Sequence, residues 1–309
     1  MERQLVIGSR GSRLALAQST IVKDQLCAAS PSISIEIQVI KTSGDVKTDP
    51  LSVIGGKGVF TKELEEALLD RRIDLAVHSL KDLPTVIPND LILSAIGERE
   101  DPRDALVLAS GAARASIRSL PPGAVVGTSS PRRAAQLRYL RPDVIIKELR
   151  GNIETRLRKL DDGEYHALVL AAAGLRRLHL ENRISHLIST DEMLPAVSQG
   201  AIGVETRADD HFANVVAAKA DHPQTRLACT AERAFLRALG GGCQLPIAGH
   251  AVVSGDQISI DGLVANPEGN ELVREQLSGA SSQAAQIGAE LGTRLLERGA
   301  RSLLGTTRS

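Results

Sequence analysis

The chain has few of the residues that mark several common classes of protein. Aromatic residues make up only 2% of its 309 residues, and 37 acidic residues balance 37 lysines and arginines. Nucleic-acid-binding proteins need a cationic surface and often use aromatic side chains on which bases stack, so this composition argues against that class. No apolar run approaches the roughly 20 residues needed to cross a bilayer, so we expect no membrane segment.

Cysteine is also scarce, with three residues and no Cys-x-x-Cys pair. An odd number without paired spacing argues against a disulfide framework and against a thiolate zinc site. The seven histidines show no His-Glu-x-x-His spacing, so we expect no metal. The amino terminus enters an apolar strand almost at once, without the basic start and cleavage site of a signal peptide. We therefore expect a cytoplasmic protein.

Sequence motifs that bind nucleotides are missing as well. Neither the G-x-x-x-x-G-K-[ST] phosphate loop nor the G-x-G-x-x-G fingerprint occurs in the sequence. The glycine-rich run 55-GGKG-58 fits a flexible lid better, with Lys57 bringing positive charge to an anion. A phosphate-transferring enzyme is therefore disfavoured.

What the chain does contain is an alternation of strand and helix patterns, which is typical of largely parallel α/β sheets. The strand patterns cover residues 32–40, 73–80, 124–130, 144–149 and 167–173, and the helix patterns cover 13–29, 61–72, 131–140 and 152–160. After a further helix over 223–239 the pattern changes. Three strands then follow at 247–253, 257–265 and 271–277, with a last helix near 281–299. This order predicts a small α+β domain with an antiparallel sheet.

Two stretches of the chain repeat one another. Residues 6–18 and 126–136 each contain an apolar strand that ends in glycine, then hydroxyl residues, an arginine and an alanine-rich helix. A helix N-terminus reached through such a turn presents free N–H groups and the positive end of the helix dipole to an anion. Two such turns facing each other across a cleft predict a site for a polyanionic ligand between two halves of the molecule.

Arginine is favoured over lysine, with 28 arginines against 9 lysines. The base composition of the genome is one explanation, but the guanidinium fork also fits carboxylate and phosphate groups. Many of the arginines recur at strand-to-helix turns, namely Arg10, Arg13, Arg132, Arg133, Arg150, Arg156, Arg176 and Arg177. This placement favours a site for carboxylates or phosphates.

Asp82, within 78-HSLKDLP-84, follows an apolar strand at the edge where ligands bind in open α/β sheets. A carboxylate there is suited to stabilise a developing cation and to move a proton. A surface ion pair or a loop cap fits the same pattern. His78 is more typical of a satisfied, partly buried histidine than of a catalyst.

Cys243 lies in 240-GGGCQLP-246, soon after a helix ends. The dipole at that end of a helix does not favour a thiolate, so Cys243 is poorly suited to fast nucleophilic attack. It is suited to form one permanent bond to a reactive electrophile. Cys27 and Cys229 lie within apolar helix patterns and are predicted to be core residues.

Seven motifs, in the same order, resemble the porphobilinogen deaminase family over essentially the whole chain. They are 55-GGKGVFTKELE-65, 75-LAVHSLKDLP-84, 98-EREDPRDA-105, 127-GTSSPRR-133, 149-LRGNIETRL-157, 195-PAVSQGAIGVE-205 and 240-GGGCQLPI-247. One departure is Pro131, where the family more usually has leucine. Proline is well tolerated in the first turn of a helix, so little is put in doubt.

The resemblance implies two doubly wound domains of the periplasmic-binding-protein type, with a cleft between them, and a small third domain that carries a cofactor cysteine. We expect the first domain over 1–98 and 199–220, the second over 99–198 and the third over 221–309. The implied protein is a monomeric transferase that joins four porphobilinogen molecules head to tail into hydroxymethylbilane, with release of four ammonia. Its product would pass to uroporphyrinogen-III synthase.

The resemblance also implies site residues and a dipyrromethane cofactor joined to Cys243 by a thioether. Asp82 matches the catalytic carboxylate, assisted by Lys81. The implied cofactor contacts are Ser79, Lys81, Asp82, Thr128, Ser129, Ser130, Arg132, Arg133, Arg150 and Gly151. The implied substrate contacts are Arg10, Ser12, Gln18, Arg150, Arg156, Arg177 and Gln199, and a mobile loop contains Lys57 and Phe60. The alternative is a two-domain protein that binds a small anion without transforming it.

Overall fold

The computed structural model describes residues 4–42, 61–110, 115–241 and 245–305. The chain divides into two compact units, one of residues 1–100 and 201–226 and the other of residues 101–200 and 227–309. The division into three domains is finer than this one and stays a prediction. No helix in the described ranges is long and apolar enough to cross a membrane.

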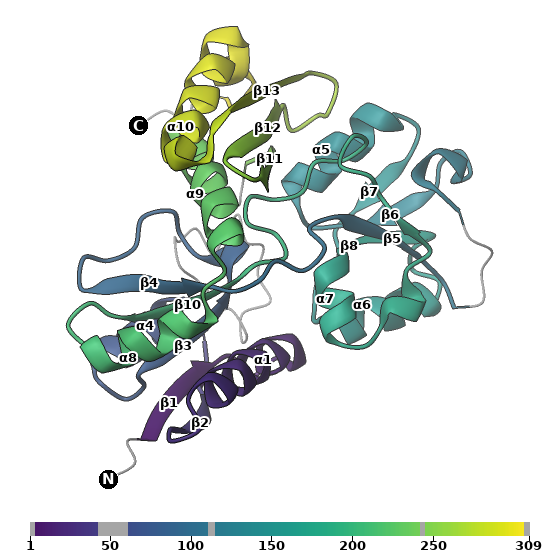
Figure 1. The fold of residues 1–309 in the computed structure, drawn as a ribbon. Helices are drawn as coiled ribbons and strands as arrows, with labels where there is room; N and C mark the ends of the chain where they lie inside the picture. The colour runs from purple at the N-terminus through teal and green to yellow at the C-terminus, as the bar shows by residue number, and fades with distance from the viewer. Residues whose placement is uncertain (1–3, 43–60, 111–114, 242–244, 306–309) are drawn as a thin grey trace. The chain divides into compact units, whose positions relative to one another are not determined.

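The first unit is built on a five-stranded mixed sheet with the order β2-β1-β3-β10-β4 (Figure 1). Strand β1 pairs in parallel with β2 and β3, whereas β10 is antiparallel to both of its neighbours. The strands are β1 (Gln4–Ser9), β2 (Ser34–Val39), β3 (Leu75–Ser79), β4 (Leu91–Ile96) and β10 (Ile202–Arg207). The chain thus leaves this sheet after β4 and returns to it at β10.

Helices cover both faces of the first sheet because successive strand residues enter different apolar cores. Leu75 joins the core that contains α1 (Arg13–Ala29) and α8 (His211–Ala217). Ala76, the next residue of β3, joins the opposite core under α4 (Lys62–Leu69). The sheet is therefore the middle layer of three, which leaves its strand ends as the place for a site.

The second unit contains a sheet with the order β7-β6-β8-β5-β9. Its strands are β5 (Asp104–Leu108), β6 (Val125–Gly127), β7 (Ile145–Lys147), β8 (Ala167–Ala171) and β9 (His186–Leu187). Helix α5 supplies a residue to the core on one face, and α6 and α7 supply residues to the core on the other. These helices are α5 (Pro131–Leu140), α6 (Ile153–Asp161) and α7 (Ala172–Arg177).

The two sheets repeat one topology. Their orders coincide when β6, β7, β8, β5 and β9 are matched to β1, β2, β3, β10 and β4, and the fourth strand is antiparallel in both. The glycines near the ends of β1 and β6 are also alike. A Cβ at Gly8 would lie 2.3 Å from Ile73 Cδ1, and one at Gly127 would lie 2.5 Å from Leu168 Cδ2. The structure thus confirms the repeat predicted from residues 6–18 and 126–136.

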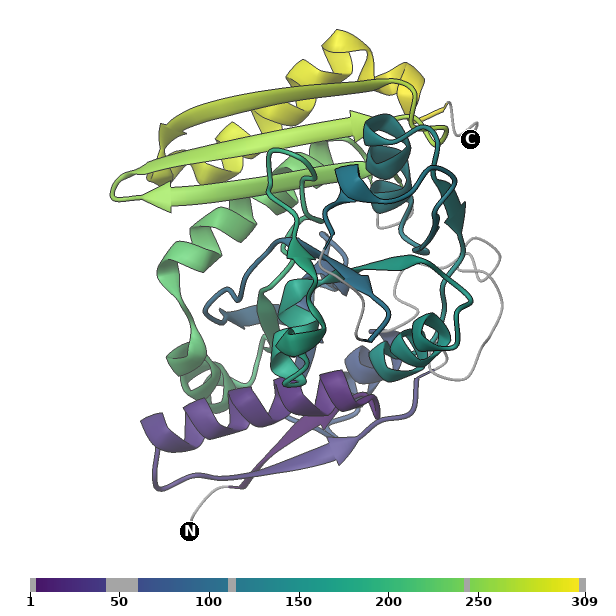
Figure 2. The ribbon, with the colours of Figure 1, turned by 90° about the vertical axis from the view of Figure 1, so that its right-hand side faces the viewer.

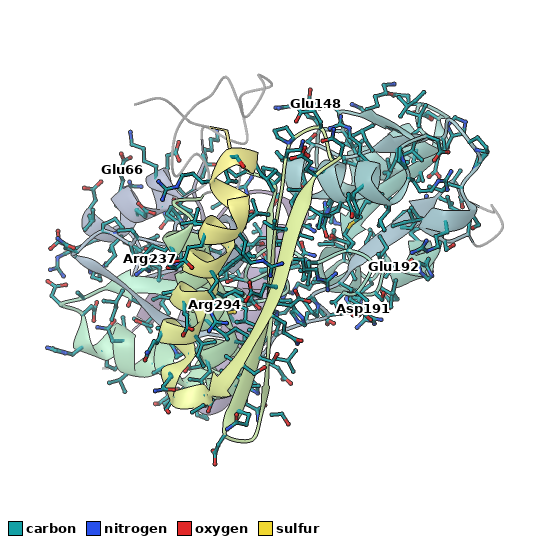
Figure 3. All side chains as sticks on the ribbon, turned by 90° about the horizontal axis from the view of Figure 1, so that it is seen from above. Glu66, Glu148, Asp191, Glu192, Arg237 and Arg294 are labelled. Carbon is teal, nitrogen blue, oxygen red and sulfur yellow. The ribbon has the colours of Figure 1, made fainter. Side chains whose placement is uncertain are left out.

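The C-terminal part of the second unit is a three-stranded antiparallel sheet with helices against it (Figure 2). Its elements are α9 (Pro223–Ala238), β11 (Ile247–Ser254), β12 (Gln257–Ala265), β13 (Leu272–Ala280) and α10 (Ala284–Leu295). Phe235 and Leu291 are fully buried in the core between them. Arg294 lies on α10 (Figure 3). It pairs with Glu290 at 2.6 Å and with Glu275 at 3.5 Å.

Short elements complete the described chain. They are η1 (Leu80–Asp82), η2 (Ile117–Ser119), η3 (Glu181–Arg183), η4 (Ala218–Ala220), η5 (Ser281–Gln283), η6 (Leu296–Ala300) and α11 (Arg301–Leu303).

The predicted fold class is confirmed as two α/β sheets and a three-stranded antiparallel sheet, and several boundaries differ. The strand expected over 167–173 ends at Ala171, because the next residues begin α7. Strands β4, β5, β9 and β10 and helices α7 and α8 were not predicted from the sequence. All five residues of β5 are buried, although its first residue, Asp104, is the last residue of the charged run 98-EREDPRD-104.

Candidate active site

Asp82 lies on a single 3-10 turn, η1, that directly follows β3. Leu80 anchors this turn. Its side chain is buried, and its N–H donates to the carbonyl of Ala201 at 3.0 Å. Asp82 itself is exposed. The carboxylate therefore stands at the end of a buried strand, where the sequence analysis placed it.

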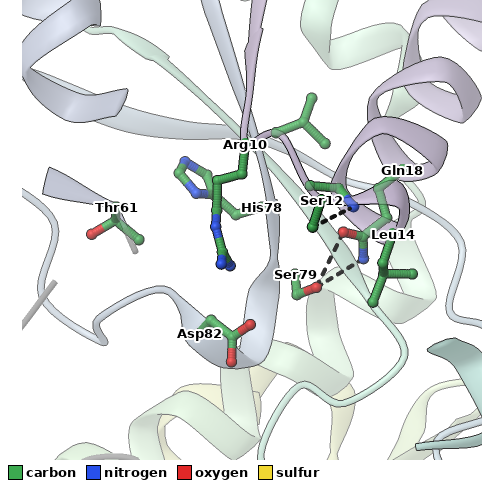
Figure 4. Close-up of a pocket in the computed structure, with 10 residues that line it drawn as sticks. Arg10, Ser12, Leu14, Gln18, Thr61, His78, Ser79 and Asp82 are labelled. Carbon is green, nitrogen blue, oxygen red and sulfur yellow. Dashed lines mark hydrogen bonds between the residues drawn. The ribbon is translucent and has the colours of Figure 1, made fainter. Parts of the chain in front are cut away.

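A pocket lies beside this turn, within the first unit (Figure 4). Asp82 and Arg10 point toward one another across it. Ser12, the N-cap of α1, accepts a hydrogen bond from the N–H of Ala15 at 3.2 Å, which fixes the start of the helix at the pocket. The lining residues are Arg10, Ser12, Leu14, Ala15, Gln18, Thr61, Val77, His78, Ser79 and Asp82.

The pocket thus combines a carboxylate with features that attract carboxylates. The N-terminus of α1 and the Arg10 guanidinium both favour an anionic ligand. Asp82 favours a cation or a group that donates a proton. A molecule with acidic side chains and a cationic reacting centre would satisfy both demands.

Gln18 and Ser79 join α1 to β3 at the same pocket. The Gln18 Nε2 donates to Ser79 Oγ at 2.8 Å, and Ser79 Oγ lies 3.2 Å from Gln18 Oε1 (Figure 4). These contacts fix the residue that precedes the Asp82 turn. Both side chains had been predicted to bind ligands, and the structure brings them together in one place.

Two glutamates, one buried and one partly buried, are associated with His78 of the pocket lining. His78 Nε2 is 3.2 Å from Glu205 Oε2, and Glu205 Oε1 has no hydrogen-bond partner among the described residues. Burial raises the pKa of Glu65 on α4, and the nearby carboxylate of Glu205 adds to the shift. His78 is therefore a satisfied, buried histidine, as its sequence context predicts.

In the second unit, the turn between β6 and α5 carries three hydroxyl residues. Ser130 is the N-cap of α5 and accepts from the N–H of Arg133 at 3.4 Å. Ser129 Oγ donates to the carbonyl of Leu149 at 2.5 Å and accepts from its N–H at 3.1 Å. Thr128 Oγ1 accepts from the N–H of Ser130 at 3.2 Å. These hydroxyls give the turn a fixed shape.

Arg132 and Arg133 point into the second unit and converge on Asp104. Arg132 Nη1 donates to Asp104 Oδ2 at 2.7 Å, and Arg133 donates to Oδ1 through Nε at 3.1 Å and Nη2 at 2.7 Å. The arginines are 4% and 7% exposed, and the aspartate is fully buried. Burial opposes the ionised form of Asp104, but the two guanidinium groups outweigh it and hold its pKa well below the usual range.

Arg150 and Arg156 lie at the next strand-to-helix turn. Arg150 Nε donates to Glu148 at 2.7 Å, and its side chain is 30% exposed. Arg156 Nε donates to the carbonyl of Gly151 at 2.7 Å, where the backbone has a φ of 107° that suits glycine. Arg150 lies at the strand-to-helix turn, as expected, whereas Arg156 lies within α6 and reaches back to the turn.

Gln199 and Arg177 make hydrogen bonds near the point where the chain leaves the second unit, at residue 200. Gln199 Nε2 donates to Asp104 Oδ1 and to the carbonyl of Pro102, both at 2.8 Å. Arg177 Nη2 donates to the carbonyl of Gly200 at 2.6 Å.

Three predicted site residues, Lys57, Phe60 and Cys243, lie outside the described residues, and their roles stay predictions. In the ranges that the structure describes, no group of three or more His, Cys, Asp or Glu side chains is arranged to hold a metal ion.

The sequence analysis missed Asp104, Glu205 and Glu65. Asp104 lies inside the motif 98-EREDPRDA-105, and the available signal was a carboxylate followed directly by an apolar run, 105-ALVL-108. Such a residue needs a cationic partner if the run is a buried strand.

Comparison with known families decides what kind of protein contains this pocket. The model described as "Porphobilinogen deaminase, dipyromethane cofactor binding domain" matches residues 5–214, and "Porphobilinogen deaminase, C-terminal domain" matches residues 226–297. The chain belongs to the porphobilinogen deaminase family. It is a transferase with porphobilinogen deaminase activity in tetrapyrrole biosynthesis, and its cofactor is dipyrromethane. The non-catalytic alternative is set aside by this match.

Individual relatives agree with the family match. The chain is 49% identical to porphobilinogen deaminase of Syntrophobacter fumaroxidans over 98% of this chain and 97% of that one. It is 50% identical to the porphobilinogen deaminase of Roseiflexus sp. over 98% of this chain and 99% of the other.

Two solved structures show a weaker likeness. A probable amino-acid ABC transporter extracellular-binding protein, ytmK from Bacillus subtilis, matches with a TM-score of 0.42 and 10% identity, over 71% of this chain and 90% of that one. The Bordetella pertussis BvgS periplasmic VFT2 domain matches with a TM-score of 0.41 and 13% identity, over 70% of this chain and 85% of the other.

Proposed function

We propose that Asp82 is the catalytic carboxylate of this porphobilinogen deaminase and that Lys81 assists it. One observation carries the proposal: Asp82 shares its pocket with Arg10 and the N-terminus of α1. Porphobilinogen has an acetate, a propionate and an aminomethyl group. The cation and the helix end suit the substrate's carboxylates, and the Asp82 carboxylate suits its cationic centre.

The proposed reaction leaves Asp82 two tasks. The carbon–nitrogen bond of the aminomethyl group breaks and its electron pair leaves with ammonia, so that a cation forms on the substrate's methylene. Asp82 stabilises this cation. A carbon–carbon bond then forms to the next pyrrole, whose ring carbon loses a proton. Asp82 accepts that proton and passes it to ammonia. Four such steps join four porphobilinogen units head to tail, and a water molecule supplies the terminal hydroxyl group when the four-ring product is released as hydroxymethylbilane.

The proposed cofactor contacts fit an anionic group. Dipyrromethane supplies a primer of two pyrrole rings with four carboxylates when it is bound. The buried cluster of Arg132, Arg133 and Asp104 has one more positive than negative charge, and a further carboxylate would balance it. With these arginines, the contacts proposed are Ser79, Lys81, Asp82, Thr128, Ser129, Ser130, Arg150 and Gly151, and the thioether is at Cys243.

A second set of residues is proposed to bind the substrate. The proposed residues are Arg10, Ser12, Gln18, Arg150, Arg156, Arg177 and Gln199. Lys57 and Phe60 belong to the proposed mobile loop over the site. The wider proposal is a cytoplasmic monomer of three domains, with a cleft between the first two, that passes its product to uroporphyrinogen-III synthase.

Asp82→Asn tests the central assignment. The amide keeps the shape of the side chain but has neither the charge nor the capacity to accept the proton, so we expect turnover to fall by several orders of magnitude, on the scale of about 10³-fold or more. Intact mass should show that the cofactor is still attached. Near-normal turnover of cofactor-bearing Asp82→Asn would rule out the assignment.

Asp90→Asn is the matched control. Asp90 is an exposed aspartate in the same unit, and it does not line the pocket. We expect wild-type turnover from this variant.

A further inference from the structure

We infer that Asp104 is a positioning residue that orients Arg132 and Arg133 for the carboxylate they bind. The inference rests on the proposed role of these two arginines in cofactor binding. It adds a residue that would not touch the ligand and would act through the two guanidinium groups.

The contacts of Asp104 are complete on both carboxylate oxygens. Oδ2 accepts from Arg132 at 2.7 Å, and Oδ1 accepts from Arg133 at 2.7 and 3.1 Å and from Gln199 at 2.8 Å. Backbone carbonyls also accept from each arginine. Arg132 Nη1 donates to the carbonyl of Leu194 at 2.7 Å, and Arg133 Nη1 donates to that of Val169 at 3.1 Å.

Without Asp104, the two buried guanidinium groups would be electrostatically unfavourable. Arg132 and Arg133 are neighbours in the first turn of α5, where the helix dipole disfavours cations. Burial further disfavours their charged forms, and it lowers the pKa of Arg132. Asp104 offsets both effects with one charge, because a single carboxylate can accept from two guanidinium forks at once.

The cluster remains unbalanced by one positive charge after Asp104 is counted. Two cations and one anion are buried together, so the cluster favours one more anion. Asp104 thus fixes the directions of the two guanidinium forks. It leaves an excess of one positive charge, which an external carboxylate would neutralise. Removal of Asp104 would let the guanidinium groups turn away from each other and would misplace them for the ligand.

The backbone around Asp104 supports a positioning role. Gln199 follows Ser198, whose φ of 63° is rare for a residue with a side chain. The Ser198 N–H donates to the buried Glu232 carboxylate at 2.6 Å, which keeps this strained segment in place. Asp104 therefore receives hydrogen bonds from α5 and from a segment with a fixed backbone. Its carboxylate has little freedom to move.

The test uses chains produced without porphobilinogen and therefore without cofactor. Porphobilinogen is added over a range of concentrations, and intact mass reports the fraction that gains two pyrrole units. We expect Asp104→Asn to need roughly tenfold more porphobilinogen for half-conversion, the size of effect seen when groups that orient metal ligands are changed. We expect Asp104→Glu to show the same direction, because its carboxylate is displaced.

Two controls separate positioning from loss of stability. Asp261 holds Arg274 through hydrogen bonds of 2.6 to 3.1 Å in the same unit, so Asp261→Asn removes another aspartate–arginine pair, which is partly exposed and not proposed to bind the cofactor. Gly288→Ala destabilises the same unit by crowding a helix. Both should need the wild-type concentration of porphobilinogen, whatever their melting temperatures.

The outcomes distinguish a failure of the inference from a failure of the proposed cofactor binding on which it rests. Wild-type conversion by Arg133→Gln and Arg132→Gln would mean that the arginines do not serve the cofactor, and their proposed role in cofactor binding would fail. Impaired arginine variants with wild-type conversion by folded Asp104→Asn would overturn the inference alone. If Asp104→Asn does not fold, Asp104→Glu decides, and wild-type conversion by it would overturn the inference.

Discussion

His78 of β3 and Glu205 of β10 meet inside the first unit, with His78 Nε2 3.2 Å from Glu205 Oε2 and side chains that are 3% and 0% exposed. The strands are antiparallel, and His78 lies opposite Gly203, so Glu205 is two residues along on the same face. This contact lies directly behind the pocket that His78 and Asp82 line. The shape of the site therefore depends on a buried polar pair.

Removal of Glu205 should destabilise the first unit strongly. Glu205→Ala leaves His78 buried without its acceptor, and we expect a loss of about 3 kcal/mol in the free energy of unfolding. Urea denaturation measures it. Asp209→Ala breaks an exposed pair with Arg71 and should cost less than about 1 kcal/mol. Equal losses in the two variants would contradict this account of the pair.

Gly288→Ala should destabilise the C-terminal part of the chain. A Cβ there would lie 2.0 Å from the carbonyl oxygen of Ala231, so α10 would have to move away from α9. We expect the free energy of unfolding to fall by about 1–3 kcal/mol or more. Gly97→Ala is the control, because its Cβ would meet nothing closer than 3.8 Å. A melting temperature unchanged by Gly288→Ala would show that the helices are not this close.

The stability supplied by Asp104 should depend on pH. Its pKa is depressed in the folded chain, because the guanidinium groups of Arg132 and Arg133 outweigh the effect of burial. Such a group stabilises the fold fully above its unfolded pKa of about 3.9, and the contribution is lost as the pH falls toward the folded value. The difference in unfolding free energy between wild type and Asp104→Asn should therefore be largest near pH 7 and shrink below about pH 4. A difference that grows at low pH would contradict the assignment.

The sequence predicted the parts of the fold that have a clear period or a clear turn. Pro131 begins α5, as expected for a proline in a first helical turn, and the β12 prediction, 257–265, matches to the residue. The repeat of residues 6–18 and 126–136 is present as matching strand–turn–helix units of two sheets that share one strand order. These features are local, so neighbouring residues determine them.

The missed features depend on distant partners. Strand β10 enters the first sheet between β3 and β4, which come more than a hundred residues earlier. Asp104 is explained only by Arg132 and Arg133, and Glu205 only by His78. No local pattern states which distant side chain will neutralise a buried charge. The same limit explains why the buried contacts of Arg132 and Arg133 to Asp104 were not predicted.

The intact mass of the purified protein, with Cys243→Ser beside it, tests the central claim most directly. We predict that the wild-type chain exceeds its sequence mass by two porphobilinogen units less two ammonia, and that Cys243→Ser has no such excess. If the purified wild type has no excess, porphobilinogen is added and the mass is measured again, which distinguishes a preparation without cofactor from a wrong assignment. A wild-type chain that stays at its sequence mass after this addition, or an equal excess on Cys243→Ser, would contradict the account.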